Sequence, residues 1–522
     1  MTSHRDSRSY SAVAEVSKAS VLSGTNKVVL FYPPYDGPPL GAPLSLLCLA
    51  SPLLQAGFEV KLVDNLISPD YEKTILRESE DALLLGISVL TGPHIGAAVR
   101  VSKAVKRLRP NLPVVFGGWH ASLATHQTLR EPFVDAIVRG QGELTLLELA
   151  QRIANRQDWH GIRGLSFKDG DGGIVHEPER PVADINTLPA PAYHLADPGI
   201  YAAASGVRQL AYTSSVGCPY QCNYCTDQVF YKRRFNAYRV ERVVDELAEL
   251  IPRYNIEHVP LFDSNFLVDR KRAVAIAKGI VASGIKFQWD FQTSTDFLAL
   301  MSEDDVRLLA ESGVHHIGFG TESASQEVLA LMNKRFQHVE QMVETARKTN
   351  LAGIHVVFNI ILGYPGETDA HRQQTFRVMS EIARGYPNVS FSPNIFTPYP
   401  GIPIWPQLKE MGVYEPQSLE EWETLALGTN VLPWLSGEEL RRLRRSLEYF
   451  LLNNQIRKVA RKIPWARRSV QRLLGAPVRW RIGKSRYSFP WELWVSRAVE
   501  KVVTRRSLLT GQPLAERTQE VC

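Results

Sequence analysis

The sequence predicts an α/β protein made of two consecutive strand–helix series and a helical C-terminal region. Short β-branched runs alternate with amphipathic stretches over residues 27–155, and the same alternation resumes over 208–405. From residue 406 onward, apolar residues recur mainly at helical spacing. Because 522 residues exceed what one hydrophobic core organises, we expect two or three domains.

The composition is that of a globular protein, with 44% hydrophobic and 22% charged residues. The net charge of +6 is mild and gives no reason to expect a nucleic-acid partner. Three of the five cysteines are clustered and two are scattered, which is no disulfide framework and favours a reducing compartment. Residues 1–26 are polar and contain no apolar h-region, so we interpret them as a flexible leader of a cytoplasmic protein.

The first series, residues 27–155, predicts a doubly wound, Rossmann-like parallel sheet. The expected strands are 27–32, 58–63, 83–89, 113–116 and 136–138, and the expected helices are 44–57, 95–108 and 144–153. Ligands of such sheets bind beyond the carboxyl ends of the strands, where glycine lets the backbone approach a bulky group closely. Four residues in these loops are candidate cofactor contacts, namely Ser88, Gly117, Gly118 and Gly140.

Residues 156–207 are expected to connect the two series through a Gly-rich hairpin and a Pro-rich link. The second series, residues 208–405, contains six expected strands, at 210–213, 258–262, 287–293, 316–320, 355–362 and 388–396. A polar motif follows each strand, as expected where the carboxyl ends of parallel strands build a site.

The most informative motif follows the first of these strands. Cys218, Cys222 and Cys225 are spaced C-x3-C-x2-C. Thiolates are ligands for zinc or iron–sulfur clusters. A structural zinc site needs four ligands, and no histidine follows within thirty residues. Three thiolates can hold three irons of a [4Fe–4S] cubane and leave one iron free to bind a small molecule.

This spacing, with Tyr224 directly before the last cysteine, resembles the signature of the radical S-adenosylmethionine (SAM) superfamily. The resemblance implies that SAM chelates the fourth iron of the cluster. An electron from the cluster then cleaves SAM to methionine and a 5′-deoxyadenosyl radical, which abstracts a hydrogen atom from the substrate. It also implies that the second series folds as an open (β/α)6 partial TIM barrel.

The same resemblance assigns SAM contacts to residues at the barrel top. Glu322 would accept the ribose hydroxyls, with a carboxylate at a helix N-terminus as the alternative. Asp263 and Asn265 stand where the amino group of SAM binds, although an Asx turn also explains them. Tyr224 and Gly363 would lie near the adenine, and the alternative for Gly363 is a simple tight turn.

The first series resembles the cobalamin-binding domain found upstream of the radical SAM core in one large subfamily. Base-off cobalamin domains typically carry D-x-H-x-x-G, whose histidine ligates cobalt from below. Here the matching residues are Asp64-Asn65-Leu66-Ile67-Ser68-Pro69, with leucine in the histidine position. Cobalamin would then bind without that ligand; a domain that only supports the fold or binds substrate is the alternative.

These resemblances imply a cobalamin-binding radical SAM enzyme similar to class B methyltransferases. It would use SAM, a [4Fe–4S] cluster and cobalamin to methylate an unactivated carbon of a hydrophobic substrate such as a lipid, tetrapyrrole or natural product. A radical oxidoreductase, cyclase or lipid carbon–carbon coupling enzyme is the first alternative. A tRNA methylthiotransferase is the second, but it would be expected to hold more N-terminal cysteines than Cys48. Flavodoxin or ferredoxin would supply the electron.

The C-terminal region, residues 406–522, is predicted to be helical, basic and aromatic. Between residues 457 and 506, Arg and Lys alternate with four tryptophans, Trp465, Trp480, Trp491 and Trp494. We expect a helical cap over the barrel mouth. Peripheral contact with an anionic membrane, or with RNA, is the alternative that this composition leaves open.

Overall fold

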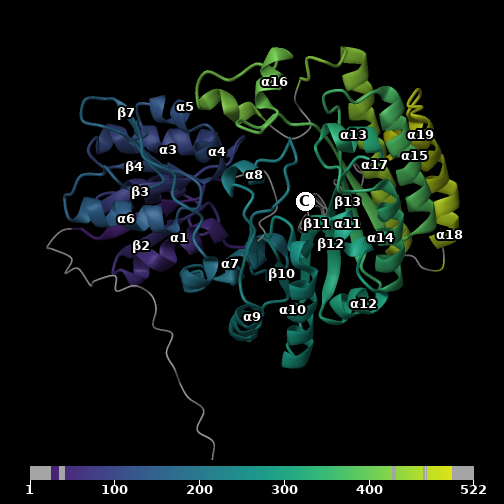
Figure 1. The fold of residues 1–522 in the computed structure, drawn as a ribbon, viewed down its shortest axis with the longest axis horizontal. Coiled ribbons are helices and arrows are strands. Elements are labelled where there is room, and N and C mark those ends of the chain that lie inside the picture. The colour runs from purple at the N-terminus through teal and green to yellow at the C-terminus, as the bar shows by residue number, and fades with distance from the viewer. Residues whose placement is uncertain (1–24, 35–40, 426–430, 463–464, 466, 497–522) are drawn as a thin grey trace, which may run out of the picture.

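The computed structural model describes residues 25–34, 41–425 and 431–496, with short gaps at 463–464 and 466. Nearly all of the predicted leader, the loop residues 35–40 and the tail beyond residue 496 lie outside the described residues. Two α/β domains lie side by side, the first in purple and blue and the second in teal and green (Figure 1). None of the helices in the described part of the chain is both long and apolar enough to cross a bilayer.

The first domain contains a sheet in the order β2-β1-β3-β4-β5-β6-β7. Its first five strands are parallel, which confirms the predicted doubly wound sheet. They are β1 (Lys27–Phe31), β2 (Glu59–Val63), β3 (Ala82–Ser88), β4 (Val114–Gly117) and β5 (Ala136–Val138). The helices are α1 (Leu44–Gln55), α2 (Tyr71–Glu78), α3 (His94–Leu108), α4 (Gly118–Leu123), α5 (Thr125–Arg130) and α6 (Glu143–Ala154).

The hairpin predicted in the connector belongs to this sheet. β6 (Leu165–Lys168) pairs antiparallel with β5, and β7 (Ile174–His176) pairs antiparallel with β6. The hairpin therefore covers the free edge of β5 and lengthens the first sheet instead of spanning the two domains. The chain then passes through α7 (Pro198–Ser205) into the second domain.

The second domain is built on a parallel sheet in the order β10-β11-β12-β13-β14. Its strands are β10 (His258–Pro260), β11 (Gln288–Ser294), β12 (Val314–Glu322), β13 (His355–Leu362) and β14 (Val389–Ile395). The expected strand at 210–213 is irregular and touches β10 only through bridges at Gln209–His258 and Tyr212–Leu261. Six strand–helix units are thus present, as predicted, and the first is the least regular.

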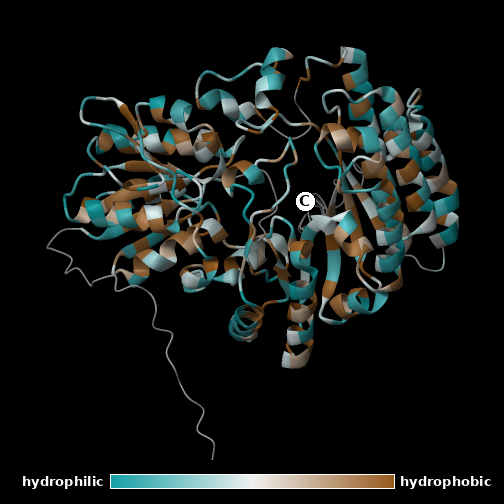
Figure 2. Ribbon diagram, viewed as in Figure 1, coloured by the Kyte–Doolittle hydropathy of each residue, from teal (hydrophilic) through white to brown (hydrophobic). Residues whose placement is uncertain are grey.

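Helices cover the outer face of this sheet, and its strands carry the apolar core (brown in Figure 2). The long helices are α9 (Val240–Tyr254), α10 (Arg270–Ser283), α12 (Glu303–Glu311), α14 (Val339–Leu351) and α15 (Asp369–Gly385). Short elements surround the strand ends, namely β8 (Ser215–Val216), α8 (Asp227–Phe230), β9 (Asn236–Ala237), α11 (Thr295–Ala299) and α13 (Gln326–Leu331). The core includes the aromatic group of Phe266, Trp289 and Phe291.

The C-terminal region covers the barrel mouth only in part: Leu432, Trp434 and Leu435 lie against Gly363 at the carboxyl end of β13, whereas most of the described helical region that follows lies elsewhere. After α16 (Trp405–Glu410), helix α17 (Gly437–Lys462) packs along β14, and α19 (Ala476–Lys484) packs on α15 and α17. These helices and α18 (Arg467–Val470) lie on the side of the second domain that faces away from the first domain (Figure 1). The reason is that β14 ends an open sheet, so its outer edge and apolar face need a cover.

Two polar side chains of α17 complete this cover. The side-chain amide of Asn454 donates to the Phe391 carbonyl (2.6 Å) and accepts from the Phe391 amide (3.2 Å), so it pairs with β14 as a further strand would. The fully buried Arg457 donates to the carbonyls of Ala383 and Tyr386, where α15 ends. Carbonyls at a helix C-terminus lack partners within the helix, which explains a buried arginine here.

We predict that Asn454→Leu will loosen β14. Both Phe391 backbone groups lose their partner, at a cost of about 1–3 kcal/mol for each group left unsatisfied. Hydrogen exchange followed by mass spectrometry should show faster exchange in peptides covering β14, with the first domain unchanged. The control is Gln455→Ala, at the next, exposed position of α17. Equal exchange in both variants would contradict the role given to Asn454.

Candidate functional site

The three cysteines lie in the loop after the irregular first strand, at the carboxyl end of the second sheet. Gly217, just before Cys218, has φ +76°, and a Cβ there would collide with the Arg234 carbonyl, so only glycine fits. Two hydrogen bonds hold the loop to the segment that follows α13. The amide of Asn223 donates to Met332 O (3.0 Å), and the side chain of Asn333 donates to Gln221 O (2.7 Å).

The thiols of this loop share one largely buried environment. Burial, together with the charge of nearby groups, raises the pKa of Cys222 to about 11 and the pKa of Cys225 to about 12. Free thiols here would be protonated at neutral pH, and a metal would displace their protons on binding. Within the described residues the one other cysteine, Cys48, lines a cavity of the first domain instead. The donor set therefore fits a cluster with one iron left open.

Asp263 holds the strand that leads into the cysteine loop. Its carboxylate accepts hydrogen bonds from Ser214 N (2.7 Å), Ser214 Oγ (2.6 Å), Ser215 Oγ (2.5 Å) and Thr213 Oγ1 (3.3 Å). With both oxygens used in this way, Asp263 positions the cysteines. Its contact with the amino group of SAM stays a prediction.

Asn265 lies next to the cysteines. Its Nδ2 is 4.0 Å from Cys218 Sγ and 3.4 Å from Ser294 Oγ, and its Oδ1 accepts from Thr293 Oγ1 (2.7 Å). The side chain is 4% exposed, so it presents an amide to a site that is nearly closed to water. Of the two residues predicted to meet the SAM amino group, Asn265 is the one whose side chain lies beside a cysteine, and the contact itself stays a prediction.

Glu322 and Tyr224 were predicted as SAM contacts, and the structure brings them together around a lysine that the sequence did not reveal. Glu322 Oε1 accepts from Tyr224 OH (2.9 Å) and from Lys334 Nζ (3.0 Å). Lys334 Nζ also donates to Gly320 O (2.6 Å). Burial alone would lower the pKa of Lys334, but Glu322 and Cys222 more than offset it and raise that pKa. Lys334 therefore stays charged and fixes the carboxylate.

Asp296, at the start of α11, is a second residue that sequence reasoning missed. Its side chain is buried, and Oδ1 has no hydrogen-bond partner. Burial raises its pKa to about 6, while the charge of Lys334 acts in the opposite direction. An unsatisfied buried acceptor at the barrel top is what a ligand hydroxyl or ammonium would pair with. The sequence gives no signal for it beyond its place after β11.

Gly363 has its backbone polar groups engaged within the protein. Its amide donates to Glu367 Oε2 (2.5 Å), and its carbonyl accepts from Trp434 Nε1 (2.9 Å). Leu432 and Leu435 cover the side where a Cβ would stand. An adenine could therefore meet Gly363 only by van der Waals contact, and the predicted contact is not tested by this geometry.

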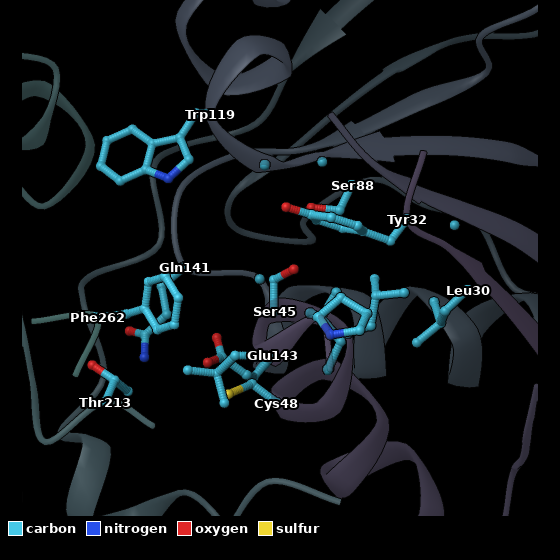
Figure 3. A pocket seen from close by; sticks show the side chains of 18 of the residues that line it. Leu30, Tyr32, Ser45, Cys48, Ser88, Trp119, Gln141, Glu143, Thr213 and Phe262 are labelled. Atoms are coloured by element: carbon cyan, nitrogen blue, oxygen red, sulfur yellow. The ribbon is translucent and has the colours of Figure 1, made fainter. Parts of the chain in front are cut away.

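A cavity of about 550 Å³ opens at the carboxyl edge of the first sheet (Figure 3). All four residues predicted there, Ser88, Gly117, Gly118 and Gly140, line it. Residues of the second domain complete its wall, among them Thr213 and Phe262. Gly118 has φ +85°, and a Cβ there would lie about 3 Å from the Val89 backbone. The cavity has the size of a small-molecule site.

Asp64 shapes the loop that follows β2 and forms part of the cavity wall. The carboxylate accepts from the amides of Leu66 (2.8 Å) and Ile67 (2.7 Å) and from Tyr201 OH (2.6 Å). Leu66 lines the cavity with an apolar side chain. It occupies the position at which base-off cobalamin domains carry the histidine that ligates cobalt. A flat macrocycle bound here would meet hydrocarbon at that position and no nitrogen ligand.

Two titratable groups line the cavity. Glu143 begins α6, Cys48 lies on α1, and both point into the cavity (Figure 3). Burial raises the pKa of Glu143 and of Cys48. Above them Trp119 packs on Phe230 of the second domain, with 4.2 Å between ring centroids, so an aromatic contact ties the two domains at the cavity rim.

Comparisons with known proteins match both domains. Residues 212–379 match the radical SAM superfamily, and residues 26–150 match the B12 binding domain. An uncharacterised methyltransferase of Pyrococcus horikoshii is 31% identical over 73% of this chain and 82% of its own length. The cytidylyl-2-hydroxyethylphosphonate methyltransferase of Streptomyces wedmorensis is 25% identical over 78% of this chain and 86% of its own length.

Solved structures share the fold. The radical SAM methyltransferase TsrM of Kitasatospora setae, with cobalamin and a [4Fe–4S] cluster bound, aligns with a TM-score of 0.65 at 23% identity, covering 74% of this chain and 78% of TsrM. The cobalamin-dependent radical SAM enzyme OxsB aligns with a TM-score of 0.70 at 17% identity, covering 88% of this chain and 72% of OxsB. The chain therefore belongs to the radical SAM superfamily, in the family of cobalamin-dependent radical SAM methyltransferases whose cofactors are SAM, a [4Fe–4S] cluster and cobalamin.

Proposed function

We propose that this protein transfers a methyl group to an unactivated carbon of a hydrophobic small molecule such as a lipid, tetrapyrrole or natural product. One observation carries the proposal. The cavity of the B12-binding domain is walled partly by Thr213, Val216 and Ser264, which flank the cysteine loop and the Asp263 motif. When bound, SAM and the reduced cluster supply a hydrogen-abstracting radical, and cobalamin supplies the methyl group.

The residues of the chain would hold these groups and keep water away. Cys218, Cys222 and Cys225 would ligate the cluster, and Asn265, Glu322 and Tyr224 would position SAM. Ser88, Gly117, Gly118 and Gly140 would contact the corrin, and Leu66 would leave its lower face without a histidine. Asp263 would act through the loop that it fastens. A flavodoxin or ferredoxin would deliver the electron.

Radical chemistry without methyl transfer is the second candidate. The anaerobic magnesium-protoporphyrin IX monomethyl ester cyclase of Rubrivivax gelatinosus is 25% identical over 69% of this chain and 65% of its own length. Its name denotes ring closure of a tetrapyrrole, so the same two domains are compatible with an oxidative outcome. A methylthiotransferase is disfavoured because its N-terminal domain would be expected to hold more cysteines than Cys48.

Two observations support a hydrophobic substrate. The hopanoid C-3 methylase of Methylococcus capsulatus, whose name denotes a lipid substrate, is 24% identical over 70% of this chain. In the C-terminal region, Phe489 is 70% exposed and Trp494 is 50% exposed, in the same segment of the sequence as the exposed basic residues Lys484 and Arg486. Exposed aromatic rings beside cations suit an anionic lipid surface, and we propose peripheral membrane contact there.

The first prediction of this proposal concerns the reaction. After anaerobic reconstitution with cobalamin and SAM, the protein incubated with its substrate and a reductant should form S-adenosylhomocysteine and 5′-deoxyadenosine together, as measured by liquid chromatography and mass spectrometry. Gly118→Ala should lower cobalamin content because the new Cβ crowds the Val89 backbone. The control is Gly170→Ala in the exposed β6–β7 turn, which has open space for a Cβ. Deoxyadenosine without S-adenosylhomocysteine would favour the second candidate.

The second prediction concerns SAM binding. Lys334→Met leaves Glu322 buried without its cation, so we expect SAM affinity to fall by about tenfold or more, a change of about 1.4 kcal/mol or more. Equilibrium dialysis measures the affinity, and iron content shows that the cluster is intact. Lys334→Arg should restore part of the affinity. Lys271→Met, which removes an exposed lysine of α10, is the control. Unchanged affinity in Lys334→Met would remove Glu322 from the SAM site.

The third prediction concerns the membrane. The double variant Phe489→Ser and Trp494→Ser should bind vesicles of phosphatidylglycerol and phosphatidylcholine at least about tenfold more weakly than the parent, since two large side chains no longer enter the interface. Sedimentation with vesicles measures this binding. Leu351→Ser, at a 60% exposed position of α14, is the control. Equal binding by both variants, or equal binding to neutral vesicles, would argue against a lipid surface here.

A further inference from the structure

A group of histidines and one carboxylate lies at the opposite end of the second sheet from the cysteines. His258 begins β10, Asp290 is the third residue of β11, and His315 is the second residue of β12. Their ligand atoms all lie within 4.8 Å of one another. We propose that these three side chains form a binding site for a divalent transition metal of the zinc class, separate from the cluster.

The hydrogen bonds around the two imidazoles favour metal binding. His258 Nδ1 lies 3.1 Å from Gln209 Oε1, and His315 Nδ1 lies 3.2 Å from the Trp289 carbonyl. A carbonyl oxygen only accepts, so each Nδ1 carries the proton and donates it. Each ring is thereby fixed in the tautomer that leaves Nε2 as the ligating nitrogen. Histidines that bind metals are commonly oriented in this way.

The strand pairing adds an independent observation. Trp289 pairs with Val314 and Asp290 pairs with His316, so His315 is an extra residue in the β11–β12 ladder. Such bulges redirect a side chain at functional positions. Here the bulge brings the His315 ring to 5.1 Å from the His258 ring, edge to face.

His258 and Asp290 already form a close pair. His258 Nε2 is 2.6 Å from Asp290 Oδ2, and the two side chains are 16% and 19% exposed. Two of the atoms that a metal would need are therefore already turned toward each other. A metal would bind between them in place of their direct contact and would also engage His315. The partial exposure leaves room for entry of an ion and for water as a further ligand.

The donor set indicates the class of ion. Two imidazole nitrogens and one carboxylate suit Zn²⁺, Co²⁺, Ni²⁺ or Fe²⁺, whereas Mg²⁺ and Ca²⁺ prefer oxygen ligands alone. Three protein ligands and an open position occur in zinc sites that retain water. The cysteine site is chemically different because it offers three thiolates and no imidazole. The two sites can therefore be filled and assayed separately.

The position of the site suggests a structural role, in which a bound ion links neighbouring strands. β10, β11 and β12 lead at their other ends to Asn265, Ser294 and Glu322. Asp290 and Ser294 are four positions apart, a distance of about 13 Å along an extended strand. An ion bound by three neighbouring strands would hold their amino ends together and limit movement at the cofactor ends. We assign it this positioning role and no part in the chemistry.

The test uses the full-length protein with its cluster reconstituted, so that the cysteines are occupied. After this protein, prepared free of cobalamin so that the cofactor contributes no cobalt, is equilibrated with Co²⁺ and unbound ion is removed, elemental analysis should give one cobalt per chain in addition to iron. His315→Gln and Asp290→Asn should lose this cobalt and keep their iron. His194→Ala, at an exposed histidine outside the barrel, should keep both.

A second measurement covers the case in which a variant folds poorly. Zn²⁺ added to the cluster-loaded parent should raise the Tm, because an ion that binds only the folded state stabilises it. The two variants should show no such rise, and His194→Ala should show it in full. The inference would be overturned if the parent held no ion beyond iron, or if His315→Gln bound cobalt as the parent does. The His258–Asp290 contact would then be an ordinary hydrogen bond.

Discussion

The arrangement of both sites depends on the hydrogen bonds that the carboxylate of Asp263 accepts. This carboxylate accepts hydrogen bonds from four donors in residues 213–215, directly after a first strand that pairs with its neighbour only through isolated bridges. On one side of this anchor the chain turns through Gly217 into the cysteines. On the other side Thr213 reaches the cavity of the first domain. One buried carboxylate therefore sets the positions of the cluster loop and the cavity wall.

The second constraint is the way the two sheets face each other. In a parallel sheet the loops that bind cofactors gather at the carboxyl edge, and each domain presents that edge to the other. The Trp119–Phe230 contact and the hydrogen bond from Tyr193 OH to Ala211 O (2.8 Å) link the domains close to this junction. Cofactors bound by different domains can thereby serve one substrate.

Much of the fold could be predicted because buried parallel strands appear in the amino-acid sequence as unbroken runs of apolar residues. Ala82–Ser88, buried along its whole length, is such a run, and its polar last residue marks the ligand edge. The cysteine spacing was equally explicit. Lys334 and Asp296 could not be predicted, since a buried lysine becomes meaningful only when Glu322 is seen beside it. The place of the C-terminal helices also could not be predicted, because an amphipathic pattern shows which face is buried and not what covers it.

The pairing of Asn454 with Phe391 bears on whether copies of the chain associate with one another in the cell. A half-open barrel ends in a strand whose free amides and carbonyls would accept any extended segment, including the same strand of another molecule. By occupying those groups with a side chain, α17 denies them to a second copy without adding another strand. A nascent chain that has not yet emerged beyond β14 would lack this protection and would be most prone to self-association at that stage of synthesis.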